Sequence, residues 1–415
     1  MSRRKIMLVA AEASGDALGA NLARALRRRL GPDVSFVGVG GPRLAEQGVA
    51  SPFEIAQLSI LGVVEAIKAY GRVKARVRDA IALAEREQPD AVVLIDSWGF
   101  TLRVAQGLRR AMPGLPVIKY VGPQVWASRP GRARTLAQAV DHLLAIHVFD
   151  APIFEAAGLK TTFVGNPALS TDFSDADGAR FRAAIGARPD QPVLLVLPGS
   201  RPHEIERVGP AFAEAVGRLA RERPDLIAVV PVAETVAGRV KAEVATWPVP
   251  VRLIEGEAAK RDAMKGATVA LACSGTVSTE LALAGCPMVI AYRVDPPTYW
   301  VARPLVRAKF ITLFNIAADA AVAPEFIQGD CTGPELAAAV AARLDDPVMR
   351  TRQVEQQFAA LDRMGRGGPD PSERAAEALL ELLGMRSLEV QQDSIQALPG
   401  VSASARVVIP PGGPA

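Results

Sequence analysis

Short apolar runs alternate with longer amphipathic segments along this chain, and the alternation occurs in two series. The first series predicts strands at residues 6–10, 34–39, 91–95 and 117–121, with a shorter one between His142 and His147. The second series predicts strands at residues 193–197, 226–232, 251–254, 269–272 and 288–292. Strands that alternate with helices through short loops form parallel sheets covered by helices. We therefore predict an α/β protein with two doubly wound, Rossmann-like domains that face a cleft.

The two series are separated near residues 170–190, where Ser-Thr-Asp-Phe-Ser-Asp-Ala-Asp-Gly interrupts the hydrophobic periodicity. A length of 415 residues suits two domains of ordinary size. The last segment is rich in Pro, Gly, Ser and Gln and lacks an amphipathic pattern, which is typical of a flexible tail. We expect an N-terminal domain, a C-terminal domain, a closing helix and a tail, over residues 1–175, 190–370, 371–387 and 388–415.

Composition excludes several classes of protein. Three widely spaced cysteines form neither a disulfide framework nor a metal knuckle, which fits a reducing cytosol. The histidines form no ligand cluster, and we expect no metal and no other cofactor. No apolar run approaches 18 residues, so no membrane-spanning helix is predicted. A basic start before an apolar run resembles a signal peptide, but Glu12 and Asp16 interrupt it, which favours a first strand.

Basic residues cluster in the first 140 residues, although the formal net charge of the chain is only +4. The clusters lie at 24–29, 72–78 and 129–134. Such clusters are commonly solvated faces, and the alternative is attraction to phospholipid or a phosphorylated substrate. No aromatic residues interleave with them, so nucleic acid is not expected as a partner. The amphipathic segment 58–83 either packs on its own sheet or contacts a membrane surface or acyl chain.

Residues 269–287 carry the most informative local motif. An apolar strand enters the turn Ser274-Gly275-Thr276, which opens a helix that carries Glu280 about one turn further in. The unpaired N–H groups and positive dipole end of such a helix suit a phosphate. A carboxylate one turn into the helix can accept hydrogen bonds from two sugar hydroxyls. The motif therefore indicates a nucleotide diphosphate site, although ordinary helix caps also use these residue types.

Two further residues have the chemistry that glycosyl transfer requires. Arg201 follows Pro-Gly-Ser after a strand, where a guanidinium can neutralise charge on a departing phosphate. Asp96 ends an apolar strand, where a general base for an acceptor hydroxyl would stand. The alternatives are a surface arginine paired with Glu204 or Glu206, and an ordinary helix N-cap at Asp96.

The ordered motifs of the chain resemble those of the lipid-A-disaccharide synthase family, inverting glycosyltransferases of the two-domain GT-B fold. In the first half they are Ala-Glu-Ala-Ser-Gly-Asp at 11–16, Gly-Val-Gly-Gly-Pro-Arg at 38–43, Leu-Ser-Ile-Leu-Gly-Val-Val-Glu at 58–65, Ile-Asp-Ser at 95–97 and Pro-Gln-Val-Trp-Ala at 123–127. In the second half they are Leu-Pro-Gly-Ser-Arg-Pro-His-Glu-Ile at 197–205, Ser-Gly-Thr-Val-Ser-Thr-Glu-Leu-Ala at 274–282 and Pro-Glu-Phe-Ile-Gln at 324–328. The resemblance extends to about residue 385.

The resemblance implies a reaction and a location. UDP-2,3-diacylglucosamine would donate its sugar to 2,3-diacylglucosamine 1-phosphate, giving a β-1,6-linked disaccharide and UDP without a metal. The N-terminal domain would bind the acceptor and the C-terminal domain the UDP-sugar. The protein would be cytoplasmic and peripherally associated with the inner membrane. The resemblance leaves open whether it forms a homodimer.

The resemblance also implies roles for individual residues. Catalysis would rest on Asp96 and Arg201. The UDP-sugar would contact Ser200, Glu204, Ser274, Gly275, Thr276, Glu280 and Asn315. The acceptor would contact Gln124 and the turn Ser14-Gly15-Asp16, which precedes a helix predicted over 17–30.

Departures from the family pattern concentrate on the acceptor side. Trp98-Gly99-Phe100-Thr101 follows Asp96 where the family tends to have Pro-Asp-Phe-Asn, and Gly122 replaces the serine of Val-Ser-Pro. Two alternatives therefore stay open. One is another UDP-sugar enzyme of the same fold, with a different acceptor or a hydrolysing epimerase activity. The other is a catalytically silent paralogue that binds UDP-sugar or lipid.

Overall fold

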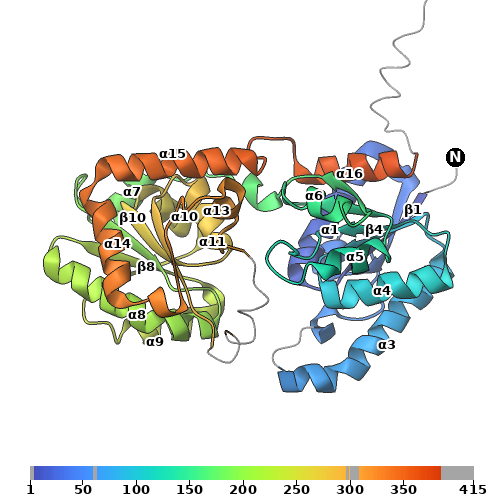
Figure 1. Cartoon of the computed structure of the whole chain (residues 1–415), viewed down its shortest axis with the longest axis horizontal. Helices are drawn as coiled ribbons and strands as arrows, with labels where there is room; N and C mark the ends of the chain where they lie inside the picture. The colour runs from blue at the N-terminus through green and yellow to red at the C-terminus, as the bar shows by residue number, and fades with distance from the viewer. Residues whose placement is uncertain (1–3, 59–62, 296–298, 300–307, 385–415) are drawn as a thin grey trace, which may run out of the picture.

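Two parallel six-stranded sheets, each in its own lobe, form the framework of the protein in the computed structural model (Figure 1). The structure describes residues 4–58, 63–295, 299 and 308–384, so the predicted tail lies outside the described residues. The predicted α/β architecture of two doubly wound sheets is confirmed. No helix within the described ranges is both long and apolar enough to cross a bilayer.

The first sheet has the strand order β2-β1-β3-β4-β5-β6. Its strands are β1 (Arg4–Ala10), β2 (Val34–Val39), β3 (Ala91–Ile95), β4 (Val117–Tyr120), β5 (His142–Ala145) and β6 (Lys160–Phe163). The helices of this lobe are α1 (Ala13–Leu30), α2 (Pro42–Ala45), α3 (Val63–Glu87), α4 (Trp98–Ala111), α5 (Gly131–Ala137) and α6 (Ala151–Glu155). Sequence periodicity did not indicate β6, a short edge strand without a fully buried residue.

The second sheet has the strand order β12-β11-β10-β7-β8-β9. Its strands are β7 (Val193–Leu197), β8 (Ile227–Val232), β9 (Arg252–Glu255), β10 (Val269–Cys273), β11 (Met288–Tyr292) and β12 (Glu325–Ile327). The helices that follow residue 175 are α7 (Gly178–Ala184), α8 (Pro202–Glu222), α9 (Ala237–Val244), α10 (Glu257–Gly266), α11 (Thr276–Leu283), α13 (Leu313–Ala318), α14 (Gly333–Asp345), α15 (Pro347–Arg363) and α16 (Pro371–Leu382).

Both sheets are buried on their two faces. Strands β3, β7 and β10 consist of fully buried apolar residues, apart from the buried Cys273 at the end of β10. Alternate residues of each strand enter the separate apolar clusters on the two faces. Parallel strands that are covered by helices on both sides have this near-continuous apolar composition.

Each sheet has one point at which the chain reverses its direction of winding. From β1 the chain passes to β2 on one side and then returns to β3 on the other. In the same way it passes from β7 through β8 to β9 and returns to β10. Loops at the carboxyl ends of such neighbouring strands diverge, and ligands of open α/β sheets bind there. The β1–β3 and β7–β10 edges are therefore the places to look for a site.

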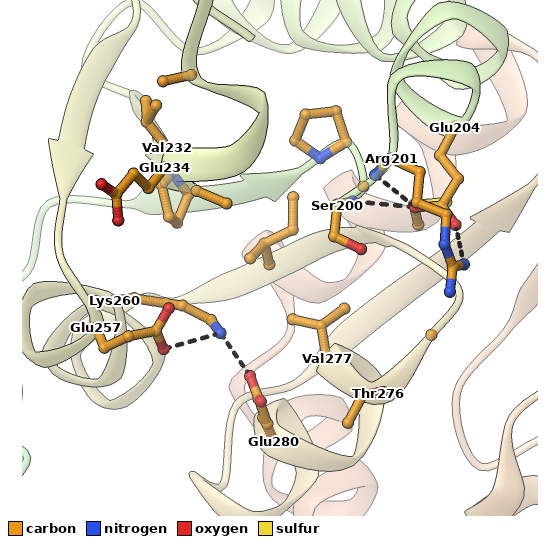
Figure 2. Close-up of a pocket in the computed structure, with 18 of the residues that line it drawn as sticks. Ser200, Arg201, Glu204, Val232, Glu234, Glu257, Lys260, Thr276, Val277 and Glu280 are labelled. Carbon is orange, nitrogen blue, oxygen red and sulfur yellow. Dashed lines mark hydrogen bonds and ion pairs between the residues drawn. The ribbon is translucent and has the colours of Figure 1, made fainter. Parts of the chain in front are cut away.

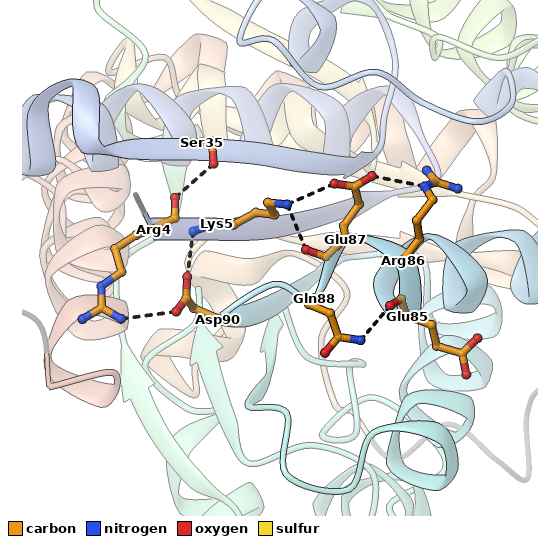
Figure 3. Close-up of polar contacts among 8 residues, drawn as sticks. All are labelled: Arg4, Lys5, Ser35, Glu85, Arg86, Glu87, Gln88 and Asp90. Atoms are coloured by element: carbon orange, nitrogen blue, oxygen red, sulfur yellow. Dashed lines mark hydrogen bonds and ion pairs between the residues drawn. The ribbon is translucent and has the colours of Figure 1, made fainter. Parts of the chain in front are cut away.

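The amino end of β1 is tied to the end of α3 and the loop that leads into β3 (Figure 3). The backbone N–H of Lys5 donates to Asp90 Oδ2 at 2.7 Å, and Lys5 Nζ donates to the carbonyl and the carboxylate of Glu87 at 2.9 and 3.1 Å. Hydrogen bonds from Lys5 and then Arg86 hold the pKa of Glu87 below its usual value. These contacts place β1 beside β3 in register.

The chain returns to the first lobe at its end. Helix α15 lies along the second lobe, and α16 packs against α1 of the first (Figure 1). Glu373 of α16 accepts hydrogen bonds from Arg28 Nε at 2.8 Å and Arg29 Nε at 2.9 Å. Leu379 is fully buried among residues of β1, β3 and α1. The helix expected from residue 371 thus completes the core of the lobe that begins the chain.

The docking of α16 gives a stability prediction. Leu379→Ala should lower the free energy of opening of α1 by about 2–4 kcal/mol, because it leaves a cavity in the core of the first lobe. Hydrogen exchange of α1 amides measures this free energy. The control is Leu382→Ala on the same helix, where the side chain is 41% exposed and a change within about 0.5 kcal/mol is expected. Equal effects of the two variants would contradict the docking.

Candidate functional site

A cavity of about 790 Å³ lies at the carboxyl edge of the second sheet. The loops that follow β7, β8, β9 and β10 line it, so it occupies the β7–β10 point of reversal (Figure 2). Its volume is in the range that holds a small-molecule ligand or cofactor. Six of the seven residues expected to bind a UDP-sugar are among those that line it: Ser200, Glu204, Ser274, Gly275, Thr276 and Glu280.

The loop after β7 is held by one buried carboxylate. Glu204 accepts hydrogen bonds from the backbone N–H groups of Ser200 and Arg201, at 3.0 and 3.2 Å, and from Arg201 Nη1 at 2.8 Å. Gly199 has a φ of +123°, and a Cβ there would lie 2.6 Å from the Cβ of Glu204. The turn therefore requires glycine. Glu204 lines the cavity, but its carboxylate oxygens are engaged with this loop, which differs from the expected direct contact with ligand.

Arg201 stands at the N-cap of α8 and lines the cavity. The pairing with Glu204 that was considered as an alternative is present, yet the Arg201 side chain remains 68% exposed. A guanidinium has five donors, so the pair leaves several N–H groups for an anion. Arg201 can therefore pair with Glu204 and still offer N–H groups to an anionic ligand in the cavity.

The first turn of α11 is the part of the cavity wall best suited to an anion. The helix opens at Thr276 with Gly275 at the N-cap, as the sequence predicts. Gly275 and Thr276 are exposed, and glycine has no side chain that could occupy the first-turn N–H groups. Ser278 donates through Oγ to the carbonyl of Gly275 at 2.7 Å, which fixes the turn. N–H groups of a first helical turn have no acceptor within the helix and favour negative charge.

Glu280 faces a cationic partner that the sequence did not reveal. Lys260 of α10 places Nζ 2.8 Å from Glu280 Oε2 and 3.4 Å from Glu257 Oε2 (Figure 2). Burial acts to lower the pKa of Lys260, but the Glu280 and Glu257 carboxylates outweigh it and leave this pKa above its usual value. Lys260 therefore stays charged and fixes the Glu280 carboxylate at the cavity wall.

Cys273 also lines the cavity but has no nucleophilic character. Burial, followed by the Glu204 carboxylate, raises the pKa of this thiol to about 12. A nucleophilic cysteine needs the opposite shift. Within the described ranges, no group of three His, Cys, Asp or Glu side chains is arranged as a metal site.

Asn315 does not belong to this cavity. Its side chain is fully buried, donates to the Ala323 carbonyl and the Glu325 carboxylate, both at 2.8 Å, and accepts from the Ala323 N–H at 3.0 Å. A fully buried amide cannot reach a ligand in this conformation. The Asn315 side chain thus supports the turn before β12 and lies outside the cavity lining, and its contact with a UDP-sugar stays a prediction.

The β1–β3 edge of the first sheet brings Ser14 and Asp96 together. Ser14 Oγ donates to Asp96 Oδ2 at 3.3 Å, and both residues are open to solvent in part. Asp96 and Ser97 have left-handed backbones, with φ of 49° and 40°. Helix α4 has Ser97, not Asp96, at its N-cap, so the alternative of an ordinary capping aspartate at position 96 is not observed. Gln124, after β4, is exposed at the same edge.

Asp16 lies in a different environment from the one that the sequence predicts. Helix α1 begins at Ala13, so Ser14, Gly15 and Asp16 lie in its first turn and not in a loop before residue 17. The buried Asp16 carboxylate accepts hydrogen bonds from three backbone N–H groups at the start of α2, those of the N-cap Gly41 and of Arg43 and Leu44, at 2.7, 3.0 and 3.1 Å.

Gly15 also differs from the expectation of an open turn, because it lies inside the first turn of α1. It is buried, and a Cβ at this position would lie 3.4 Å from both the Ile95 carbonyl oxygen and the Ala10 Cβ. Gly15 therefore lets α1 approach the sheet closely. Of the residues expected to contact the acceptor, only Ser14 and Gln124 present side chains to solvent.

Known proteins that are similar to this chain in sequence share one family description. A family model described as lipid-A-disaccharide synthetase matches residues 6–371. The lipid-A-disaccharide synthase of Rhodospirillum centenum is 44% identical over 387 residues, which cover 93% of this chain and 96% of the relative. That of Ruegeria pomeroyi is 42% identical over 388 residues, covering 91% of this chain and 95% of the relative.

Solved structures that resemble the chain show its fold. The UDP complex of MnaA from S. aureus has a TM-score of 0.61 at 16% identity, covering 92% of this chain and 97% of the other. MurG from Acinetobacter baumannii has a TM-score of 0.54 at 15% identity, with 91% and 99% covered. At these identities the likeness concerns architecture, which is GT-B-like.

The structural role of Asp16 gives a second stability prediction. Asp16→Ala should lower the free energy of unfolding by about 3 kcal/mol, because it removes three charge-assisted hydrogen bonds and leaves the N–H groups at the start of α2, including that of the buried Leu44, without their acceptor. Urea denaturation measures it. Asp33→Ala, at an exposed position, is the control. A loss no greater than that of the control would mean that Asp16 does not stabilise the start of α2.

Proposed function

The chain belongs to the lipid-A-disaccharide synthetase family, and from this membership we propose how its two sheet edges divide the reaction. The protein is a glycosyltransferase of lipid A disaccharide synthesis. We propose that the donor is UDP-2,3-diacylglucosamine and the acceptor 2,3-diacylglucosamine 1-phosphate. Residues 190–370 would hold the donor, and residues 1–175 the acceptor.

The cavity beside α11 supports a UDP site, and this is the observation that carries the proposal. The diphosphate would lie against the first-turn N–H groups of α11 and beside Ser200. The ribose hydroxyls would donate to the Glu280 carboxylate, which Lys260 holds in place. The nucleobase would then occupy the other end of the cavity, between the loops after β8 and β9, where Val232 and Glu234 lie (Figure 2).

Transfer requires a base on the acceptor side and a countercharge on the donor side. We assign the base to Asp96, which would take the proton of the acceptor 6-hydroxyl while its oxygen attacks the anomeric carbon. The new bond forms on the face opposite the breaking carbon–phosphate-oxygen bond, which inverts the configuration. UDP departs with the bonding electrons, and Arg201 and the α11 N–H groups offset its developing charge.

We further propose that the protein works at the cytoplasmic surface of the inner membrane, where both acylated substrates would be embedded. Arg72, Lys74 and Arg78 of α3 are exposed in the first lobe, which supports contact with anionic head groups. The same helix packs on the sheet through Val77, which is buried. A nucleic acid partner has no support from the arrangement of these basic residues.

The direct test of the function is incubation of the purified protein with both acylated glucosamine substrates. Wild type should form the disaccharide 1-phosphate and UDP in equal amounts. Asp96→Asn should lower kcat by a factor of about 10² to 10⁴, since the base is lost, while the KM for the UDP-sugar changes little. Asp190→Asn, an exposed carboxylate, is the control. Absence of product with wild type would refute the function, and full activity of Asp96→Asn would refute the assignment of the base.

Glu280 gives a separate prediction for UDP binding. Glu280→Gln should weaken UDP by about 10- to 100-fold in isothermal titration calorimetry, because charge-assisted hydrogen bonds to the ribose are replaced by neutral ones. Glu206→Gln is the control, since Glu206 is an exposed carboxylate of the same lobe that does not line the cavity. If both variants bind UDP as wild type does, the ribose site lies elsewhere.

A further inference from the structure

Lys119 is a charged residue in the apolar core of the first lobe. In β4, Val117 and Lys119 face one side of the sheet, and Ile118 and Tyr120 face the other. Lys119 is 2% exposed, and the residues around it on that side form an apolar cluster. A buried ammonium is costly unless it is hydrogen-bonded. The hydrogen-bond partners of Lys119 should therefore explain why β4 has a lysine at this buried position.

The amine of Lys119 reaches the turn that carries the proposed base. Lys119 Nζ donates to the backbone carbonyl of Asp96 and, at 2.9 Å, to Thr101 Oγ1. The Thr101 hydroxyl, which is itself fully buried, lies 2.8 Å from the Asp96 carbonyl oxygen and 2.9 Å from that of Ser97. Lys119 and Thr101 therefore converge from β4 and α4 on the two carbonyl groups of this turn.

The turn needs such support. Asp96 and Ser97 are consecutive non-glycine residues with positive φ, a conformation that is unfavourable for residues with a Cβ. Residues of this kind persist where the surrounding structure over-determines them. Here the surrounding groups are the Lys119 amine and the Thr101 hydroxyl beneath the turn, and Ser14 above the Asp96 carboxylate.

The charges near Lys119 come from the same edge of the sheet. Burial lowers the pKa of Lys119 to about 7, while the carboxylates of Asp96, after β3, and Glu12, after β1, act to raise it. The amine therefore remains protonated in the acidic range.

We propose that Lys119 is a positioning residue for sugar transfer, whose amine, together with Thr101, holds the Asp96–Ser97 turn so that the Asp96 carboxylate faces the acceptor. The proposal rests on the function proposed above. Without the amine, the Asp96 carbonyl loses a donor and Thr101 Oγ1 loses its contact with Lys119, so the turn can relax to a right-handed conformation. A shift of about 1 Å in a catalytic group is enough to cost about 10²-fold in rate.

Lys119→Met is the principal test, because methionine has a similar length and removes only the amine. It should lower kcat by about 10²-fold and leave the KM for the UDP-sugar nearly unchanged. Its thermal midpoint should stay within about 3 °C, since replacing a buried charge by an apolar side chain is often neutral for stability. Lys160→Met, on an exposed lysine of β6, is the control.

Thr101 supplies a second pair of variants, which keep the proposal testable if Lys119→Met does not fold. Thr101→Ser retains the hydroxyl and should keep at least half of the wild-type kcat, whereas Thr101→Val, of the same shape without the hydroxyl, should lose about tenfold. Loss of kcat in both variants alike, or in neither, would overturn the proposal.

Hydrogen exchange of a peptide that spans residues 94–103 separates this proposal from the function it rests on. The Lys119→Met variant should exchange these amides at least tenfold faster than wild type, while amides of β2 exchange at the wild-type rate. Unchanged exchange with unchanged kcat would overturn the proposal. If wild type formed no disaccharide, the proposed function would be wrong. Hydrogen exchange would still test the Lys119 contact on its own, because an unchanged exchange rate in Lys119→Met would show that Lys119 does not stabilise the turn.

Discussion

The parallel arrangement of the strands determines where the polar residues and the cavity lie in each lobe. Because all strands of a sheet run in one direction, their carboxyl ends meet at one edge, and the loops there diverge where the winding reverses. In the first sheet this point lies between β1 and β3 and carries Ser14 and Asp96. In the second it lies between β7 and β10 and opens into the cavity. A two-substrate reaction can thus be divided between two equivalent edges.

Buried charged side chains hold the loops at these edges. Asp16 accepts three backbone hydrogen bonds at the start of α2, which follows β2. Glu204 binds the loop after β7, and Lys119 donates to the turn after β3. Each charge satisfies polar backbone groups that a tight loop cannot pair within itself. The cost of burying the charge is offset by these hydrogen bonds, and the loop is fixed before substrate arrives. Such fixed geometry is what catalysis by positioned groups requires.

The parts of the site that depend on residues adjacent in the chain could be predicted from the sequence. The strand–turn–helix at Ser274 to Glu280 and the position of Asp96 after β3 were predictable, because each depends on neighbouring residues. Lys260 and Lys119 were missed because their partners lie on other elements, at Glu280 and Asp96. The burial of Asp16 and Asn315 was missed for a related reason. A motif locates a residue in the chain, whereas burial and hydrogen-bond partners decide whether its side chain can reach a ligand.

In the proposed donor complex the UDP moiety lies at the β7–β10 edge, with its diphosphate at the first turn of α11 and its ribose at Glu280. A crystal structure of the protein soaked with UDP shows whether it binds there. Phosphate oxygens should lie within hydrogen-bond distance of the α11 first-turn N–H groups, and ribose hydroxyls should contact the Glu280 carboxylate. UDP bound at the β1–β3 edge, or with its phosphates away from α11, would contradict this arrangement.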